Sequence, residues 1–214
     1  MNCANKLSLT LVSITTPPTL YTKFPDPFWS AGFSFARGHF TVQVPNDQFL
    51  PMVFQGEESG IALRGFTYGY DFYAPERSVA FHIFAIKGNI GRRERHKYWE
   101  NEILYTGALE KSLARLNGIV GIVGAAGELK TGFFREDIEK YGVGGVREKE
   151  TYYRTFGFHT DTQTTEGHLC QFVEESMHKA FQPHLRQDGM GIDYSTIDYE
   201  FVDANPSQHM ISNV

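Results

Sequence analysis

Two adjacent glutamates, Glu57 and Glu58, are the residues of this chain best suited to acid–base chemistry. They follow Gly56 and open a segment whose spacing predicts a helix over residues 57–68. Carboxylates in that position could orient or deprotonate an attacking hydroxyl group. They could equally stabilise the helix, because a negative charge near the positive end of the helix dipole contributes about 0.3–1 kcal/mol. The sequence leaves both interpretations open.

His82 is the best candidate for a metal ligand. It lies on a strand predicted over residues 79–84, where Ala80, His82 and Phe84 share one face. A single histidine on an apolar strand face could bind a metal, or it could be a core residue with its hydrogen bonds satisfied. A helix and two short strands separate it from Glu58, which is enough chain to return His82 to the same pocket.

The elements that must position these residues are a mixture of strands and helices. We expect strands over residues 7–14, 40–44, 71–74, 79–84 and 197–202. We expect helices over 57–68, 99–117, 135–141, 147–156 and 166–181, several of them ended by a glycine. Residues 160–165 are expected to form a polar loop. The run Gly142–Gly145 follows a helix and lacks Gly-Lys-Ser/Thr, so we do not predict a phosphate loop there.

Composition excludes some classes of function. Hydrophobic residues make up 41% of the 214 residues, charged residues 21%, and the net charge is −5, which gives no reason to expect nucleic-acid binding. Cys3 and Cys170 lack metal or redox spacing. The apolar run at residues 7–14 is interrupted by hydroxyl residues and is too short to span a bilayer, so we expect a cytoplasmic protein without a membrane segment.

An ordered set of motifs connects the chain to a known family. The motifs are Phe-Trp-Ser-Ala-Gly-Phe-Ser-Phe (28–35), Leu-Pro-Met-Val-Phe-Gln-Gly-Glu-Glu (50–58), Arg-Gly-Phe-Thr-Tyr-Gly-Tyr-Asp (64–71), Ala-Pro-Glu (74–76) and Val-Ala-Phe-His-Ile (79–83). Together they resemble the C-terminal half of the GT-A N-acetylglucosaminyltransferases that modify hydroxyproline on the adaptor protein of SCF ubiquitin ligases. Parasite Golgi enzymes for threonine-linked glycans belong to the same family.

The resemblance implies roles for residues that spacing alone does not assign. Trp29 and the segment from Gly32 to Gly38 are similar to the part of the family that binds the substrate near the donor sugar. Arg64 matches a basic position in the helix after the acidic motif, and we expect it to fix that helix.

The resemblance also implies catalytic and metal-binding roles. Glu57 and Glu58 correspond to the acidic motif that contacts the acceptor or the sugar. His82 corresponds to the histidine that completes a site for manganese or magnesium, which would neutralise the leaving UDP. Members of the family are thought to retain configuration, so Glu58 need only hold the acceptor.

The activity implied is transfer of N-acetylglucosamine from UDP-GlcNAc to a protein hydroxyl, on hydroxyproline, threonine or serine. An SCF adaptor is a possible acceptor, and a homo-oligomer is possible. The alternative of a different class is a non-catalytic module that binds a glycan or a protein. A hydrolase is a weaker alternative, since glycosidase carboxylates stand about 5–10 Å apart across a sugar.

The chain departs from the family pattern before Trp29. It contains no Asp-X-Asp motif, and only 28 residues precede Trp29. So short a segment cannot supply several βα units of about 30 residues or more each. We therefore expect a fragment without the donor-binding half, or a chain that has lost catalysis. A membrane anchor in a missing N-terminal part would instead place the protein in the Golgi.

The expected fold class is α/β, or α+β for the chain as it stands. We expect an extended N-terminal segment over residues 1–27. The acceptor-side half of a GT-A domain should follow over 28–118, and a mainly helical extension over 119–214.

Overall fold

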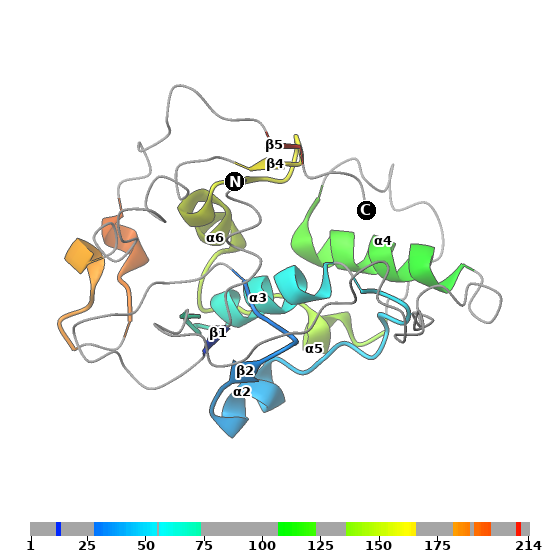
Figure 1. The fold of residues 1–214 in the computed structure, drawn as a ribbon, viewed down its shortest axis with the longest axis horizontal. Coiled ribbons are helices and arrows are strands. Elements are labelled where there is room, and N and C mark those ends of the chain that lie inside the picture. Colours follow the sequence, from blue (N-terminus) through cyan, green and yellow to red (C-terminus); the bar gives the residue numbers. More distant parts are fainter. Residues whose placement is uncertain are drawn as a thin grey trace, which may run out of the picture.

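The structure is a computed structural model that describes residues 12–13, 28–54, 56–73, 107–122, 136–165, 182–188, 191–197 and 209–210. Their element order is β1 (Val12–Ser13), β2 (Ser34–Phe35), α2 (Gly38–Gln43), α3 (Glu57–Thr67), α4 (Ala108–Val120), α5 (Ile138–Tyr141), α6 (Lys149–Phe156), β3 (Phe158–His159), β4 (Thr164–Thr165), η2 (Gln182–His184), η3 (Tyr194–Thr196) and β5 (His209–Met210) (Figure 1). This mixture of helices and short strands is compatible with an α+β fold, whereas the GT-A fold stays a prediction.

Helix α3 lies at the centre of the described residues and packs against both α4 and α6 (Figure 1). Its eight residues from Gly60 to Thr67 are buried. The helix ends at Tyr68, and Gly69 follows in the left-handed region with a φ of 92°. Glycine adopts that conformation without a steric penalty, which is why it commonly follows a helix. The helix predicted over residues 57–68 and the glycine predicted to end it are both confirmed.

The strands form two small sheets. β1 pairs with β2 in parallel, with Val12 opposite Ser34. β4 lies between β3 and β5 in an antiparallel sheet. Residues 12–13 belong to the strand predicted over 7–14. The polar loop predicted over 160–165 was wrong at its last two residues, because Thr164 and Thr165 pair with β3 and so close a hairpin.

The strand predicted over residues 40–44 was wrong, because these residues lie in α2 and its C-terminal cap. Phe40 and Val44 are buried at 4% and 3% exposure, whereas Val42 is 78% exposed. Alternation along a strand would have placed all three on one face, but a spacing of four residues brings only Phe40 and Val44 together on a helix. Burial of that pair therefore outweighs the strand preference of the β-branched residues.

The helix predicted over residues 99–117 is confirmed over residues 108–117, which lie in α4, but it is wrong at Gly107 and in its predicted end at Gly118. Gly107 has a φ of 75°, so a right-handed helix cannot continue through it, and α4 begins at the next residue. The helix then passes Gly118 and ends before Gly121, whose φ is 79°. Residues 99–106 lie outside the described part of the chain.

Of the remaining predicted elements, two helices end where expected, one strand does not form, and the others lie outside the described residues. The helices predicted over 135–141 and 147–156 are α5 and α6, which begin a few residues later but end as expected. No strand forms over residues 71–73. The segments predicted at 79–84, 166–181 and 198–202 lie outside the described residues. Among the described helices, none is long and apolar enough to cross a membrane.

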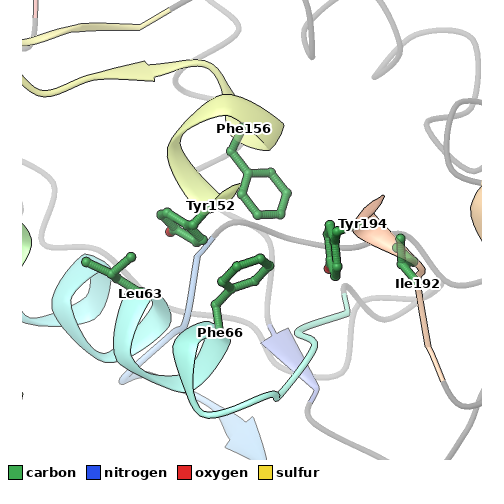
Figure 2. Close-up of a cluster of buried hydrophobic side chains, with 6 residues drawn as sticks. All are labelled: Leu63, Phe66, Tyr152, Phe156, Ile192 and Tyr194. Carbon is green, nitrogen blue, oxygen red and sulfur yellow. The ribbon is translucent and has the colours of Figure 1, made fainter. Parts of the chain in front are cut away.

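Aromatic side chains dominate the core between α3 and α6 (Figure 2). Phe66 of α3 meets Tyr152 of α6 and Tyr194 edge-to-face, with ring centroids 5.4 and 4.9 Å apart. Such pairs contribute about 0.5–1.5 kcal/mol beyond the burial of their surface. Leu63, Phe156 and Ile192 complete this cluster. The cluster joins residues from before and after position 118, which is the predicted boundary between the acceptor-side half and the helical extension. Helix α3 and the C-terminal segments therefore share one core.

The glycine-rich loop after α5 packs against the C-terminal end of α3. Gly144 N donates to Thr67 Oγ1 over 2.7 Å, and the Thr67 carbonyl accepts from Val146 N and Arg147 N over 3.0 and 3.1 Å. A Cβ atom at Gly144 would lie 2.7 Å from that carbonyl oxygen, so only glycine allows the approach. The loop thus supplies donors to the last carbonyl of the helix, whereas the three carbonyls before it accept from residues 68–70.

Candidate functional site

A cavity of about 250 Å³ lies between the N-terminal half of α3, helix α4 and the loop that precedes α3. We call it the Trp29 cavity. Its apolar wall is formed by Leu50, Val53, Ile61, Leu116 and Ile119. Its polar lining comes from Trp29, Asn46, Asp47, Glu57, Arg64 and Tyr141. Three residues that the sequence singled out, Trp29, Glu57 and Arg64, therefore meet in one place.

The two adjacent glutamates have different surroundings. Glu57 lines the cavity, and its Oε2 atom is sealed from solvent without a hydrogen-bond partner among the described residues. Glu58 Oε1 accepts a hydrogen bond of 2.6 Å from Ala31 N. Gly56, with a φ of 97°, makes the turn that starts the helix at this point. Glu57 thus lies at the cavity wall, whereas Glu58 ties the segment that carries Trp29 to the start of α3.

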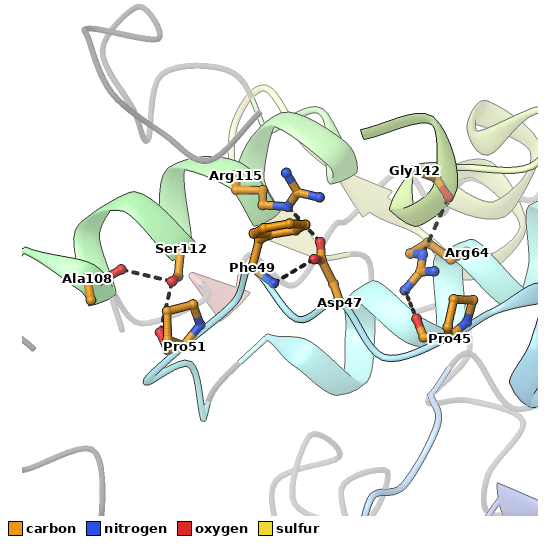
Figure 3. A network of polar contacts seen from close by, with 9 residues as sticks. All are labelled: Pro45, Asp47, Phe49, Pro51, Arg64, Ala108, Ser112, Arg115 and Gly142. Atoms are coloured by element: carbon orange, nitrogen blue, oxygen red, sulfur yellow. Dashed lines mark hydrogen bonds and ion pairs between the residues drawn. The ribbon is translucent and has the colours of Figure 1, made fainter. Parts of the chain in front are cut away.

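Arg64 connects α3 to two other segments (Figure 3). Its Nη1 donates to Pro45 O over 2.9 Å and its Nε to Gly142 O over 3.4 Å. The residue is only 3% exposed, and its Nη2 has no hydrogen-bond partner among the described residues. Arg64 therefore ties α3 to Pro45 and to Gly142, while the role that the resemblance implies for it stays a prediction.

Trp29 lines the same cavity. Its Nε1 is buried and, within the described part of the chain, makes no hydrogen bond. A buried polar atom without a partner costs about 1–3 kcal/mol. The same cost applies to Glu57 Oε2 and Arg64 Nη2, so three of the residues that line the cavity each carry a buried polar atom without a partner among the described residues.

A buried ion pair involves Asp47, one of the residues that line the cavity (Figure 3). Arg115 Nε lies 2.7 Å from Asp47 Oδ2, and the two side chains are 0% and 1% exposed. Asp47 Oδ1 also accepts from Phe49 N over 2.9 Å. The Arg115 guanidinium stacks over the rings of Phe49 and Tyr141 at 5.0 and 5.9 Å from their centroids. Because Asp47 and Tyr141 line the cavity, this pair holds part of its wall in place.

Sequence reasoning missed Asp47, Arg115 and Tyr141. One signal could have found Arg115, because it lies on the buried stripe of α4 between Ser112 and Ile119. A charged residue on such a stripe rarely stays buried unless it is paired. Nothing in the sequence identifies Asp47 as its partner, since the two residues come from different parts of the chain.

The surroundings of Glu57 favour its protonated form. Burial raises the pKa of its carboxyl group, a hydrogen bond from its own backbone opposes this, and the charge of Glu58 adds to the rise. Burial also lowers the pKa of Arg64, although Asp47 opposes that effect. The cavity therefore presents an arginine donor, an indole donor and a carboxyl group that releases its proton less readily than usual, a set suited to a neutral polar ligand.

The raised pKa of Glu57 predicts a pH-dependent effect of Glu57→Gln. The folded state binds the proton more tightly than the unfolded state, so this carboxyl contributes stability below its ordinary pKa of 4.5. That contribution is lost as the pH rises through the raised pKa of the folded state. Glutamine does not titrate, so the variant should gain stability relative to wild type as the pH rises above 4.5 and through the raised pKa of the folded state. Thermal denaturation across that range checks this, and a difference that stays constant with pH would contradict it.

Gly32 and Gly38, two more of the predicted site residues, are not brought to the cavity. Both are exposed. A Cβ atom at Gly38 would meet nothing within 4 Å, and one at Gly32 would meet only Ser30 Oγ at 3.7 Å. His82 lies outside the described residues. Within the described ranges, no three His, Cys, Asp or Glu side chains come together as a metal site would require.

Comparison of the sequence with protein-family models identifies the family to which the chain belongs. A family model described as glycosyltransferase (GlcNAc) matches residues 4–162, more than half of the 214 residues. The chain belongs to this glycosyltransferase family. Membership supports a transferase that uses a sugar donor and an acceptor, and the matched range contains Trp29, Glu57 and Arg64. No curated protein and no solved structure shows significant similarity to the chain.

Proposed function

We propose that this member of the glycosyltransferase family transfers N-acetylglucosamine from UDP-GlcNAc to a hydroxyl group of a protein, and that the Trp29 cavity binds part of the sugar. The proposal rests on one observation. Trp29, Glu57 and Arg64 line the same cavity, in a chain that belongs to a GlcNAc glycosyltransferase family. The volume of about 250 Å³ lies below the ~300–1,000 Å³ of sites for drug-sized ligands. It suits one sugar ring rather than a whole nucleotide sugar.

In the proposed reaction the acceptor oxygen forms a bond to C1 of the sugar while the bond from C1 to the diphosphate breaks. UDP leaves, and the proton of the acceptor hydroxyl passes to the oxygen of the departing diphosphate. Trp29 Nε1 and Arg64 Nη2 donate hydrogen bonds to oxygens of the sugar, and Glu57 Oε2 contacts a polar hydrogen. These contacts hold the sugar in one orientation, which is how an enzyme converts binding into a faster reaction.

The divalent metal expected from the resemblance does not fit the described residues. Among them no cluster of metal ligands forms. Glu57 and Glu58 are adjacent, but one lines the cavity and the other accepts from Ala31 N. A manganese or magnesium site thus remains a proposal that depends on His82, and none of the contacts proposed above involves a metal.

Glu57→Gln is expected to lower kcat/KM for transfer about 10- to 100-fold. At an assay pH above its raised pKa the carboxyl group of Glu57 is charged, and a hydrogen bond to a charged group contributes about 1.5–3 kcal/mol. Glutamine keeps the shape of the side chain but not that charge. The assay follows UDP release and glycopeptide formation from UDP-GlcNAc with acceptor peptides that contain hydroxyproline, threonine or serine.

Glu139→Gln is the matched control, because Glu139 is an exposed glutamate on α5, away from the cavity. It should keep wild-type turnover. Wild-type turnover in Glu57→Gln as well would remove Glu57 from the site. Testing an SCF adaptor with and without hydroxylated proline would show whether that protein is an acceptor.

A non-catalytic binding module is the second candidate, favoured by the absence of Asp-X-Asp from the sequence. It predicts that the chain binds an N-acetylglucosamine glycoside but releases no UDP with any acceptor. Multiple turnovers of UDP-GlcNAc by the purified chain would exclude it.

A further inference from the structure

We propose that a second hollow, between α6 and η3, binds a phosphate group that is carried either by free phosphate or by a small phosphorylated molecule. This hollow and the Trp29 cavity have no lining residue in common. The inference therefore goes beyond the proposed function and does not depend on it.

Three arginines line this hollow, which we call the arginine hollow. Arg147 precedes α6, Arg154 lies in the last turn of that helix, and Arg186 follows η2. The other lining residues are Glu148, Thr151, Ile192, Asp193, Tyr194 and Ser195. The volume of about 650 Å³ falls within the ~300–1,000 Å³ that is typical of sites for small ligands.

Arg147 is fixed in position before any ligand binds. Its guanidinium carbon lies 4.8 Å from the ring centroids of both Phe66 and Tyr194. Its Nη1 donates to Asp71 Oδ1 over 2.7 Å and to Tyr70 O over 3.2 Å, whereas its Nε and Nη2 have no hydrogen-bond partner among the described residues. The side chain keeps 19% of its surface exposed. An arginine held in this way loses little side-chain entropy when it binds a ligand.

Positive charge is in excess among the residues that line the hollow. Only two carboxylates, Glu148 and Asp193, line it beside the three arginines. Asp193 Oδ1 already accepts from the backbone N and the Oγ of Ser195, over 3.1 and 2.5 Å. Asp71 and Asp188, the carboxylates that pair with two of the arginines, do not line the hollow.

Phosphate is the anion that best matches these arginines. A guanidinium group presents several N–H donors in one plane, and a phosphate group can accept two of them at once from the same arginine. Arg154 and Arg186 are exposed, so their side chains can adjust to the oxygens that Arg147 does not contact. The hollow thus combines one fixed arginine with two adjustable ones.

The test titrates the full chain with inorganic phosphate at constant ionic strength and follows the backbone amide signals by NMR. We expect saturable shifts at Thr151 and Ser195, which line the arginine hollow, and none at Gly60 and Ile61, which line the Trp29 cavity. Absence of a saturable shift at Thr151 and Ser195 would overturn the proposal. A parallel titration with phenyl phosphate identifies the source of the phosphate group. Tighter binding than inorganic phosphate supports a phosphorylated molecule, and weaker binding supports free phosphate.

Arg186→Gln should weaken phosphate binding about tenfold, the factor that corresponds to the loss of one hydrogen bond to a charged group. Because Arg186 is exposed, the variant should keep the fold. Arg37→Gln is the matched control, since Arg37 is also exposed but does not line the hollow, and it should bind phosphate like wild type. Equal losses in the two variants would show an effect of net charge alone and would overturn the site.

UDP-GlcNAc separates this site from the proposed transfer reaction. Phosphate should bind equally well in the presence of UDP-GlcNAc, because the sugar is proposed to enter the Trp29 cavity. Displacement of phosphate from Thr151 and Ser195 by UDP-GlcNAc would overturn a separate phosphate site and leave the proposed function standing.

Discussion

Asp47→Asn is expected to lower the free energy of unfolding by about 3–5 kcal/mol, because it removes the negative charge that pairs with the buried guanidinium of Arg115. The Arg115 side chain is 0% exposed and its Nε lies 2.7 Å from Asp47 Oδ2. Asparagine has nearly the same size as aspartate and its oxygen can still accept from Phe49 N. The substitution therefore removes the charge with little change in packing.

Chemical denaturation of the two proteins measures this loss. Asp188→Asn is the control, since it makes the same change in the ion pair with Arg186, where the side chains are 47% and 52% exposed. An exposed pair contributes at most about 1 kcal/mol, so the control should change little. Equal effects of the two substitutions would show that the Asp47–Arg115 pair is not buried in solution. Replacing both Asp47 and Arg115 with apolar residues of similar volume should restore much of the stability.

Phe66→Ala is expected to cost about 3–5 kcal/mol of stability, the usual range for removing a buried aromatic ring. Phe66 is 2% exposed and meets the rings of Tyr152, Phe156 and Tyr194. The Arg147 guanidinium also stacks over it at 4.8 Å from the ring centroid. Its loss would open a cavity between α3 and α6 and leave three aromatic rings without their shared partner.

Phe35→Ala is the matched control for Phe66, because Phe35 lies in β2 and is 64% exposed. Substitutions at exposed positions usually change stability by less than about 0.5 kcal/mol. Denaturation curves of the two variants should therefore separate clearly. A loss at Phe35 as large as that at Phe66 would mean that the surface around β2 is covered in the folded protein.

Local signals predicted the helix ends best. Gly69 and Gly157 take left-handed conformations at the ends of α3 and α6, and each had been expected to end its helix. The strand predicted over residues 40–44 was wrong because Thr41 and Val42 continue the polar–apolar alternation that is typical of a strand. Only the tertiary environment, in which Phe40 and Val44 share a core with Ile61 and Phe72, decides in favour of a helix.

The candidate site was predictable where it depends on nearby sequence. Trp29, Glu57 and Arg64 were expected and line one cavity. Asp47 and Tyr141 were not, because their contribution depends on Arg115, which reaches them from α4. Pairings between distant segments are set by packing rather than by spacing, so the sequence of one segment does not reveal them.

The contact between Thr67 and Gly144 also sets an order of events during synthesis on the ribosome. The two residues are 77 positions apart. At about 5–20 residues per second, a ribosome adds that length in roughly 4–15 s. Until then the Thr67 carbonyl has no loop to donate to it and must bond to water, whereas the three carbonyls before it already accept from residues 68–70. The last carbonyl of the central helix therefore acquires its native donors only after much of the chain has been made, and an early termination between these residues would leave that carbonyl to solvent.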